Sequence, residues 1–108
     1  MLEAHYAPNA RVVLSNEREL VDLLISTLAS ADGPVGLLAE SSLVGLPEAI
    51  IELEPAGTAE EYASVLYARL RQADRLRLAV LVCVPPPAVG IGLAVNDRLR
   101  RAAASSNR

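Results

Sequence analysis

The sequence contains no lysine, phenylalanine or tryptophan, and it has a single cysteine and a single histidine. Without lysine there is no amine side chain for a Schiff base, a general base or the lysine of a phosphate-binding P-loop. Cys83 has no partner for an internal disulfide, which suits a reducing cytoplasm. His5 has no second histidine with which to build a metal site. These absences argue against catalysis by this chain alone and against a cofactor bound within it.

The chain also lacks an apolar run of about 18 residues, the length that a membrane-spanning helix requires. Its first residues lack the basic and then apolar layout of a signal peptide. We therefore expect a soluble, cytoplasmic protein with no membrane partner. The formal net charge of −3 argues against direct DNA binding, which depends on a strongly basic surface.

A length of 108 residues, of which 52% are hydrophobic, fits one compact domain. The pattern predicts strand, helix, strand, strand, helix, strand and helix over residues 11–15, 17–31, 35–39, 49–53, 59–74, 76–84 and 92–104. The strand segments do not alternate apolar with polar residues, and residues 76–84 form the most hydrophobic run, so we expect this run to be an interior strand covered on both faces. The predicted fold class is α/β: a three-layer sandwich with a mostly parallel four- or five-stranded sheet and helices on both faces.

Helix starts and core stripes support this order. Asn16 with Glu19, and Thr58 with Glu61, have the spacing of capping boxes. Apolar residues recur at helical spacing in each helix and predict its buried side: Leu20, Leu24 and Leu28 with Val21 and Ile25 alongside; Tyr62, Leu66 and Leu70; and Ile91, Val95, Leu99 and Ala102.

Charge is divided unevenly along the chain. Residues 1–54 carry nine acids and two arginines, a net charge of −7, whereas residues 55–108 carry four acids and eight arginines, a net charge of +4. The last helix places Arg98 and Arg101 on one face, and together with Asn96 they are candidates for contact with an anion or another domain. The alternative is that these arginines are solvated and complement helix C-termini.

Two features that suggest chemistry have simpler explanations. Cys83 ends a predicted central strand, as the nucleophile of a cysteine phosphatase does, but position 89 is valine where that loop needs arginine. Apolar neighbours predict an inert thiol. Gly90 and Gly92 open a helix as a dinucleotide-binding loop would, yet the third glycine of that motif is replaced by Val95, so a tight turn is the simpler interpretation.

Three stretches resemble one known family. Residues 1–8 match M-x-x-x-H-Y-x-P, which resembles the interdomain linker of two-domain L-threonylcarbamoyladenylate synthases. Residues 61–71 resemble the E-Y-A-x-x-L-Y-x-x-L-R helix of that family's C-terminal domain, and residues 90–102 resemble its closing helix, which begins G-x-G-x-A. The stretches occur in the family's order and span nearly the whole chain.

This resemblance implies a linker segment over residues 1–10, with the motif His-Tyr-Ala-Pro, followed by a single Rossmann-like accessory domain over residues 11–108. Its partner would be a YrdC-type catalytic domain, in cis or in trans, that makes threonylcarbamoyl-AMP from threonine, bicarbonate and ATP for threonylcarbamoyladenosine modification of tRNA. ATP and Mg are expected only with that catalytic domain. His5, Tyr6 and Pro8 would form a gate over its cleft; the alternative is that Tyr6 and Pro8 pin the segment to the first strand.

A second class of function also fits the predicted fold, namely a free-standing α/β module that binds a ligand or regulates a partner. An accessory domain separated from its catalytic partner would expose apolar interface residues, and we therefore expect a weak homodimer.

Overall fold

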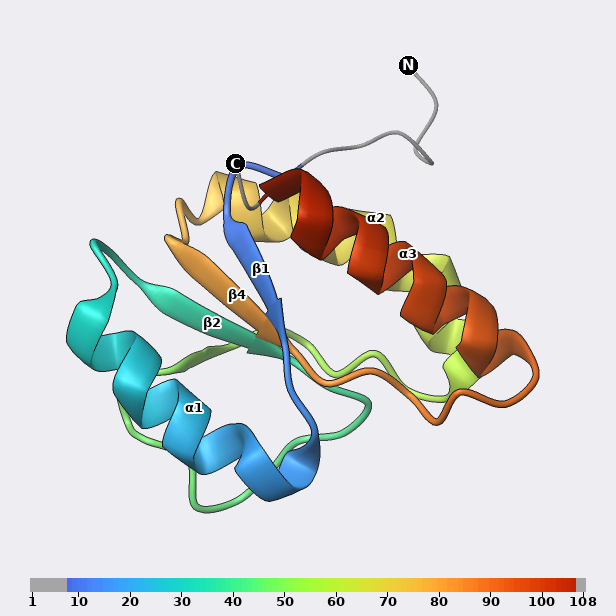
Figure 1. Cartoon of the computed structure of the whole chain (residues 1–108), viewed down its shortest axis with the longest axis horizontal. Coiled ribbons are helices and arrows are strands. Elements are labelled where there is room, and N and C mark those ends of the chain that lie inside the picture. Colours follow the sequence, from blue (N-terminus) through green and yellow to red (C-terminus); the bar gives the residue numbers. More distant parts are fainter. Residues whose placement is uncertain (1–7, 107–108) are drawn as a thin grey trace.

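The structure is a computed structural model that describes residues 8–106. Its elements are β1 (Arg11–Leu14), α1 (Glu17–Ser30), β2 (Val35–Leu38), β3 (Ile51–Glu52), α2 (Ala59–Arg75), β4 (Val80–Cys83) and α3 (Ile91–Ser106). The strands form one parallel sheet in the order β1-β4-β2-β3 (Figure 1). Within residues 8–106, no helix has the length and apolar character needed to cross a membrane.

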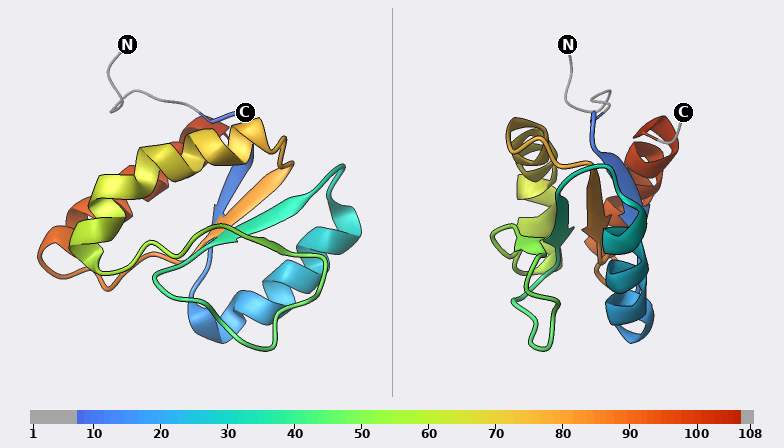
Figure 2. Two further views of the ribbon diagram at one scale, coloured as in Figure 1. Left: turned by 180° about the vertical axis from the view of Figure 1, so that it is seen from behind. Right: turned by 90° about the vertical axis from the view of Figure 1, so that its left-hand side faces the viewer.

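The helices lie on both faces of the sheet. α2 and α3 cover one face, whereas α1 and the connection between β2 and β3 lie on the other (Figure 2). One core cluster joins the strands to α2 and α3 through residues such as Leu66 and Leu99. A second cluster joins the strands to α1 through Leu20 and Leu24. This arrangement confirms the predicted α/β three-layer sandwich with a parallel sheet of four strands.

β4 is the interior strand that the hydrophobic run predicted, since it pairs with β1 on one side and β2 on the other and all four of its residues are buried. The predicted start at residue 76 was wrong. Leu76 caps α2, and Arg77 adopts a left-handed backbone with φ of 57°. The apolar run is longer than the strand because Leu78, which is buried, packs under the end of α2 before the strand begins. β3 is likewise shorter than residues 49–53.

The two predicted helix starts differ in detail. At α2 the capping box is reciprocal: Glu61 N–H donates to Thr58 Oγ1 at 3.2 Å, and Thr58 N–H donates to Glu61 Oε1 at 2.9 Å. Hydrogen bonding of the Glu61 carboxylate to the backbone N–H of Thr58, and secondly to the Thr58 side chain, lowers the pKa of that carboxyl. At α1 only half of the box forms, because Asn16 Oδ1 accepts from Glu19 N–H at 2.8 Å while the Glu19 carboxylate faces the Asn16 side-chain amide.

Three residues placed on buried stripes by their spacing are exposed. Ile91 is 43% exposed because the first turn of α3 extends past the end of the sheet (Figure 1). Val21 and Ile25 are exposed on α1, which buries only Leu20 and Leu24 fully. A single helix lies on that face, so its flanks meet no neighbouring helix and the apolar stripe is wider than the surface it covers.

Candidate functional site

Residues 8–10, called here the incoming segment, lead into β1 at the amino edge of the sheet. Pro8 is buried, Asn9 is exposed, and Ala10, at 1% exposure, belongs to the core cluster under α2 and α3. Of the predicted gate residues, Pro8 therefore packs against the folded domain. His5 and Tyr6 lie outside the residues that the structure describes.

The carboxylate of Asp74 holds the incoming segment. Asn9 N–H donates to Asp74 Oδ1 at 3.0 Å and to Oδ2 at 3.2 Å, and Ala10 N–H donates to Oδ1 at 3.1 Å. Asp74 lies 64 residues from Ala10 in the sequence, in the last turn of α2. Hydrogen bonds to an ionised acceptor are stronger than those between neutral groups, so this contact fixes the backbone at both residues.

The end of α2 sets the position of that carboxylate. Leu78 N–H donates to Ala73 O and Arg77 N–H donates to Asp74 O, both at 3.0 Å, which is the bonding pattern of a Schellman motif. Arg77 occupies the left-handed position where glycine is usual. The helix therefore ends at a defined residue, and this fixes the position of Asp74.

α3 supplies a second tie at the same edge. Val12 N–H, which points away from β4, donates to Ser106 Oγ at 2.8 Å, and that hydroxyl donates to Ala103 O at 3.1 Å. The last turns of α2 and α3 thus each contribute one side chain that binds the backbone near the start of β1.

Sequence reasoning missed both Asp74 and Ser106. For Asp74 a signal was present, because an aspartate in the last turn of a helix lies at the negative end of the helix dipole, where acidic side chains are unfavourable. Ser106 is the second of two serines that follow three alanines, and nothing in that run of small residues gives a comparable signal.

The three candidates on α3 do not converge on one point. Asn96 Nδ2 donates to Pro86 O and to Gly92 O, both at 2.8 Å, so its amide hydrogens hold the loop before the helix. Arg101 pairs with Asp97 at 3.1 Å on the exposed face. At about 100° per residue, Arg98 lies on the side of the helix opposite Asn96. Contact of these residues with an anion or another domain stays a prediction.

The buried groups capable of chemistry are structural. Cys83 is fully buried, and desolvation raises the pKa of its thiol to about 12, which fits the predicted inert thiol. Burial likewise raises the pKa of Tyr62, whose hydroxyl donates to Val84 O at 3.1 Å. Among residues 8–106, no group of three or more His, Cys, Asp or Glu side chains is placed to hold a metal ion.

A hollow of about 400 Å³ lies between the carboxyl ends of β1 and β4, where the chain leaves toward opposite faces of the sheet. Ligands of open α/β sheets commonly bind at such a point. Here the polar groups already serve the domain: Ser15 Oγ donates to Asn16 O, Asn16 caps α1, and Asn96 holds the proline loop. The Glu19 carboxylate adds negative charge beside them. The hollow therefore offers few groups to a ligand.

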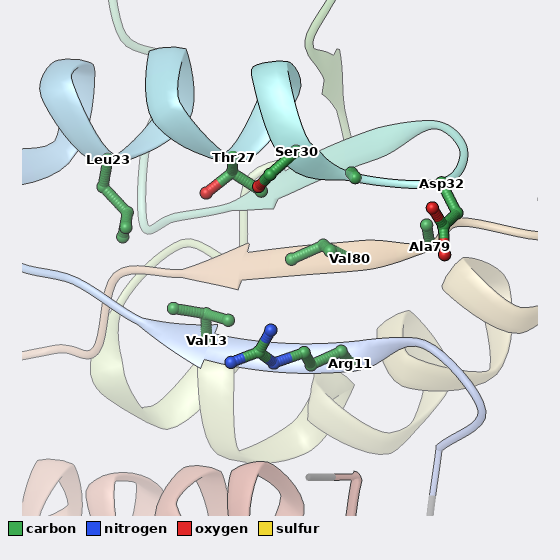
Figure 3. A pocket seen from close by; sticks show the side chains of 9 residues that line it. Arg11, Val13, Leu23, Thr27, Ser30, Asp32, Ala79 and Val80 are labelled. Carbon is green, nitrogen blue, oxygen red and sulfur yellow. The ribbon is translucent and has the colours of Figure 1, made fainter.

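A second hollow, of about 300 Å³, lies between α1 and the amino ends of β1 and β4. Thr27 and Ser30 project from α1 toward Val80, while Arg11 lies along β1 (Figure 3). Ser30 Oγ already donates to Ser26 O at 3.2 Å. The hollow results from a single helix lying over this face, and its side chains do not form a recognisable catalytic set.

Comparison with known proteins gives consistent matches. Residues 1–104 match the family model described as the C-terminal domain of threonylcarbamoyl-AMP synthase. The chain is 31% identical over 103 residues to threonylcarbamoyl-AMP synthase of Pyrococcus abyssi, covering 91% of this chain and 29% of that protein. The crystal structure of P. abyssi Sua5 complexed with L-threonine aligns with a TM-score of 0.73 at 30% identity, over 94% of this chain and 30% of that chain.

A structure of P. abyssi Sua5 in which a histidine and the adjacent tyrosine are replaced by alanine aligns with a TM-score of 0.74 at 26% identity, over 92% of this chain and 29% of that one. The present chain thus spans less than a third of the length of these relatives.

The fold and the held incoming segment define a class: a parallel α/β domain whose amino edge secures the chain that enters it. The match over residues 1–104 then identifies the family. This chain belongs to the threonylcarbamoyl-AMP synthase C-terminal domain family, as the motifs in the sequence predicted.

Proposed function

We propose that this domain is a non-catalytic accessory part of a threonylcarbamoyl-AMP synthase and acts through its linker on a YrdC-type catalytic domain in cis. That catalytic domain makes threonylcarbamoyl-AMP from threonine, bicarbonate and ATP for tRNA modification, and it is the part that binds ATP and Mg. The observation that carries the proposal is continuity: the family match begins at residue 1, and the chain from the motif runs directly into a segment bound by the folded domain.

The comparisons support a role for His5 and Tyr6 in the linker. One of the P. abyssi Sua5 structures is a complex with L-threonine. In the other, a histidine and the tyrosine that follows it are replaced by alanine. His5 is the only histidine of this chain, and Tyr6 follows it directly. We propose that these two residues lie over the catalytic cleft and contribute to closure, so that they affect the rate more than the stability.

The test is Tyr6→Ala in the full-length synthase, with Glu3→Ala as the matched control at a position that the motif leaves open. We measure threonylcarbamoyl-AMP formation and the thermal midpoint of each protein. A gate predicts that Tyr6→Ala lowers the rate by about tenfold or more with a nearly unchanged midpoint, whereas Glu3→Ala changes neither. A Tyr6→Ala rate equal to that of the parent would refute the gate.

Two further proposals concern the surroundings of the domain. The single buried cysteine and the proposed role in tRNA modification favour a cytoplasmic location.

Exposed apolar side chains occur at several places, including Val44 in the connection to β3 and Val89 and Leu93 around the start of α3. We propose that a copy lacking its catalytic partner self-associates weakly through such surfaces; sedimentation velocity at high concentration would show a strict monomer if it does not.

A further inference from the structure

We infer that Asp74 is a positioning residue for the linker: its carboxylate fixes the course of the backbone at residues 9 and 10 and so the direction in which the linker leaves the domain. This inference rests on the proposed function and adds a residue from α2 to it. It starts from three N–H to carboxylate contacts between 3.0 and 3.2 Å, which join Asp74 to Asn9 and Ala10.

The helix dipole disfavours an aspartate at this place. Asp74 lies in the last turn of α2, where the unpaired carbonyl groups give the helix a partial negative charge. Aspartate also has a low helix propensity compared with alanine. Both effects favour a neutral residue at this position of α2. The N–H groups of the incoming segment form the favourable hydrogen bonds to this carboxylate that the end of the helix does not provide.

The last turn of α2, which carries the Asp74 carboxylate, is rigid. The Schellman bonds end α2 at Leu76, and Leu78 is buried immediately afterwards, so the last turn has little freedom to move. On the other side, Ala10 is buried in the core and Pro8 packs against the domain. Asn9, which is exposed, lies between these buried residues, and the carboxylate binds its N–H group with both oxygens.

The residues that Asp74 binds lie close in sequence to Tyr6, so their contact with Asp74 is relevant to the proposed reaction. Tyr6 precedes Asn9 by only three residues, so the direction of the backbone at residues 9 and 10 restricts where Tyr6 can be placed. Small errors in the position of a group in an active site can cost a factor of about 100 in rate. Loss of these contacts is therefore expected to impair the reaction even though Asp74 is not expected to touch the substrate.

The experiment uses the full-length synthase with Asp74→Ala, Asp74→Asn and the control Asp22→Ala, which removes an exposed carboxylate from α1. Three quantities are measured: the rate of threonylcarbamoyl-AMP formation, the hydrogen exchange of the Asn9 and Ala10 amides, and the thermal midpoint. We expect Asp74→Ala to speed exchange at both amides by about tenfold or more and to lower the rate by about tenfold. Asp74→Asn keeps one acceptor oxygen and its effects should be intermediate. Asp22→Ala should change none of the three.

The outcomes separate this inference from the proposed function. If Asp74→Ala frees the two amides but leaves the rate unchanged while Tyr6→Ala still lowers it, Asp74 does not position the linker and the gate stands. Unchanged amide exchange in both Asp74 variants also overturns the inference. If Tyr6→Ala has no effect on the rate, the proposed function itself fails. Should Asp74→Ala not fold, the isosteric Asp74→Asn decides by the same readouts.

Discussion

The two edges of the sheet use their polar groups in opposite ways. At the carboxyl edge, where α/β domains usually bind ligands, the side chains of Ser15, Asn16 and Asn96 bond to the domain's own backbone. At the amino edge, Asp74 and Ser106 bind the chain that enters the domain. In the described residues, the polar groups of the carboxyl edge therefore hold the domain's own loops and helix start, whereas those of the amino edge hold the incoming segment.

The largest effect on stability should come from adding a side chain at Gly92, at the carboxyl edge. A β-carbon at Gly92 would overlap the carbonyl oxygen of Pro87, which is backbone and cannot swing aside. Gly92→Ala should therefore cost about 3 kcal/mol, measured as a loss of free energy of unfolding in urea. Under native conditions, the hydrogen-exchange rates of the Asn9 and Ala10 amides, relative to those of the other amides of the domain, should not change. A selective increase of exchange at those two amides would show that the two edges are coupled and do not act separately.

Tyr62→Phe should have the next largest effect. The substitution removes the hydroxyl that donates to Val84 O and leaves that buried carbonyl without this bond. We expect a loss of about 1.5 kcal/mol and a thermal midpoint lower by several degrees. Tyr67→Phe, on the same helix but only partly buried, is the matched control and should change the midpoint less. Equal effects of the two substitutions would remove the structural role assigned to the Tyr62 hydroxyl.

At the amino edge, Arg77→Gly should stabilise the domain. Arg77 has a left-handed backbone that glycine adopts without steric cost, so the gain should be about 0.5 to 1 kcal/mol. Calorimetry should show a higher midpoint, with unchanged exchange at Asn9 and Ala10 because the Asp74 carboxylate stays in place. A lower midpoint would mean that the Arg77 side chain contributes more to this edge than its backbone costs.

The smallest effect is on the pH dependence of stability and comes from the capping box at the start of α2, on the carboxyl side of the sheet. The pKa of Glu61 is lowered in the folded domain by its bonds with Thr58, so the capping box contributes stability above the ordinary pKa of 4.5. That contribution is lost as the pH falls through the lowered value. Glu61→Gln should therefore flatten the fall of stability in acid, as measured by urea unfolding between neutral pH and pH of about 3. An identical pH profile in the variant would contradict this role.

Much of the fold could be predicted from the sequence because its signals are local. Helix starts at Asn16 and Thr58 and the buried stripe of Tyr62, Leu66 and Leu70 follow from spacing alone, and the order of elements was right. The boundary errors at residues 76–79 arose because a buried helix end and a strand share one apolar run. The exposure of Ile91 depends on how far α3 extends past the sheet, which spacing does not encode.

The site was less accessible to sequence reasoning because it joins distant segments. The motif with His5, Tyr6 and Pro8 lies next to the incoming segment in the sequence and remains a prediction, whereas the contact between Asp74 and Ala10 bridges 64 residues. Which side chain meets an incoming backbone depends on the strand order and on the lengths of α2 and α3. Asn96 illustrates the converse: its sequence position makes it a candidate for external contact, but its amide hydrogens bond to the carbonyl oxygens of Pro86 and Gly92.

The role of Asp74 in directing the linker is tested most directly by a double-mutant cycle on the rate of threonylcarbamoyl-AMP formation by the full-length synthase, with Tyr6→Ala, Asp74→Ala and the two combined. If Asp74 acts by directing the linker that carries Tyr6, removing the anchor should matter little once Tyr6 is gone, so the double variant should be about as slow as Tyr6→Ala alone. If the two substitutions instead lower the rate independently, so that their fold-changes multiply, Asp74 does not act through the linker.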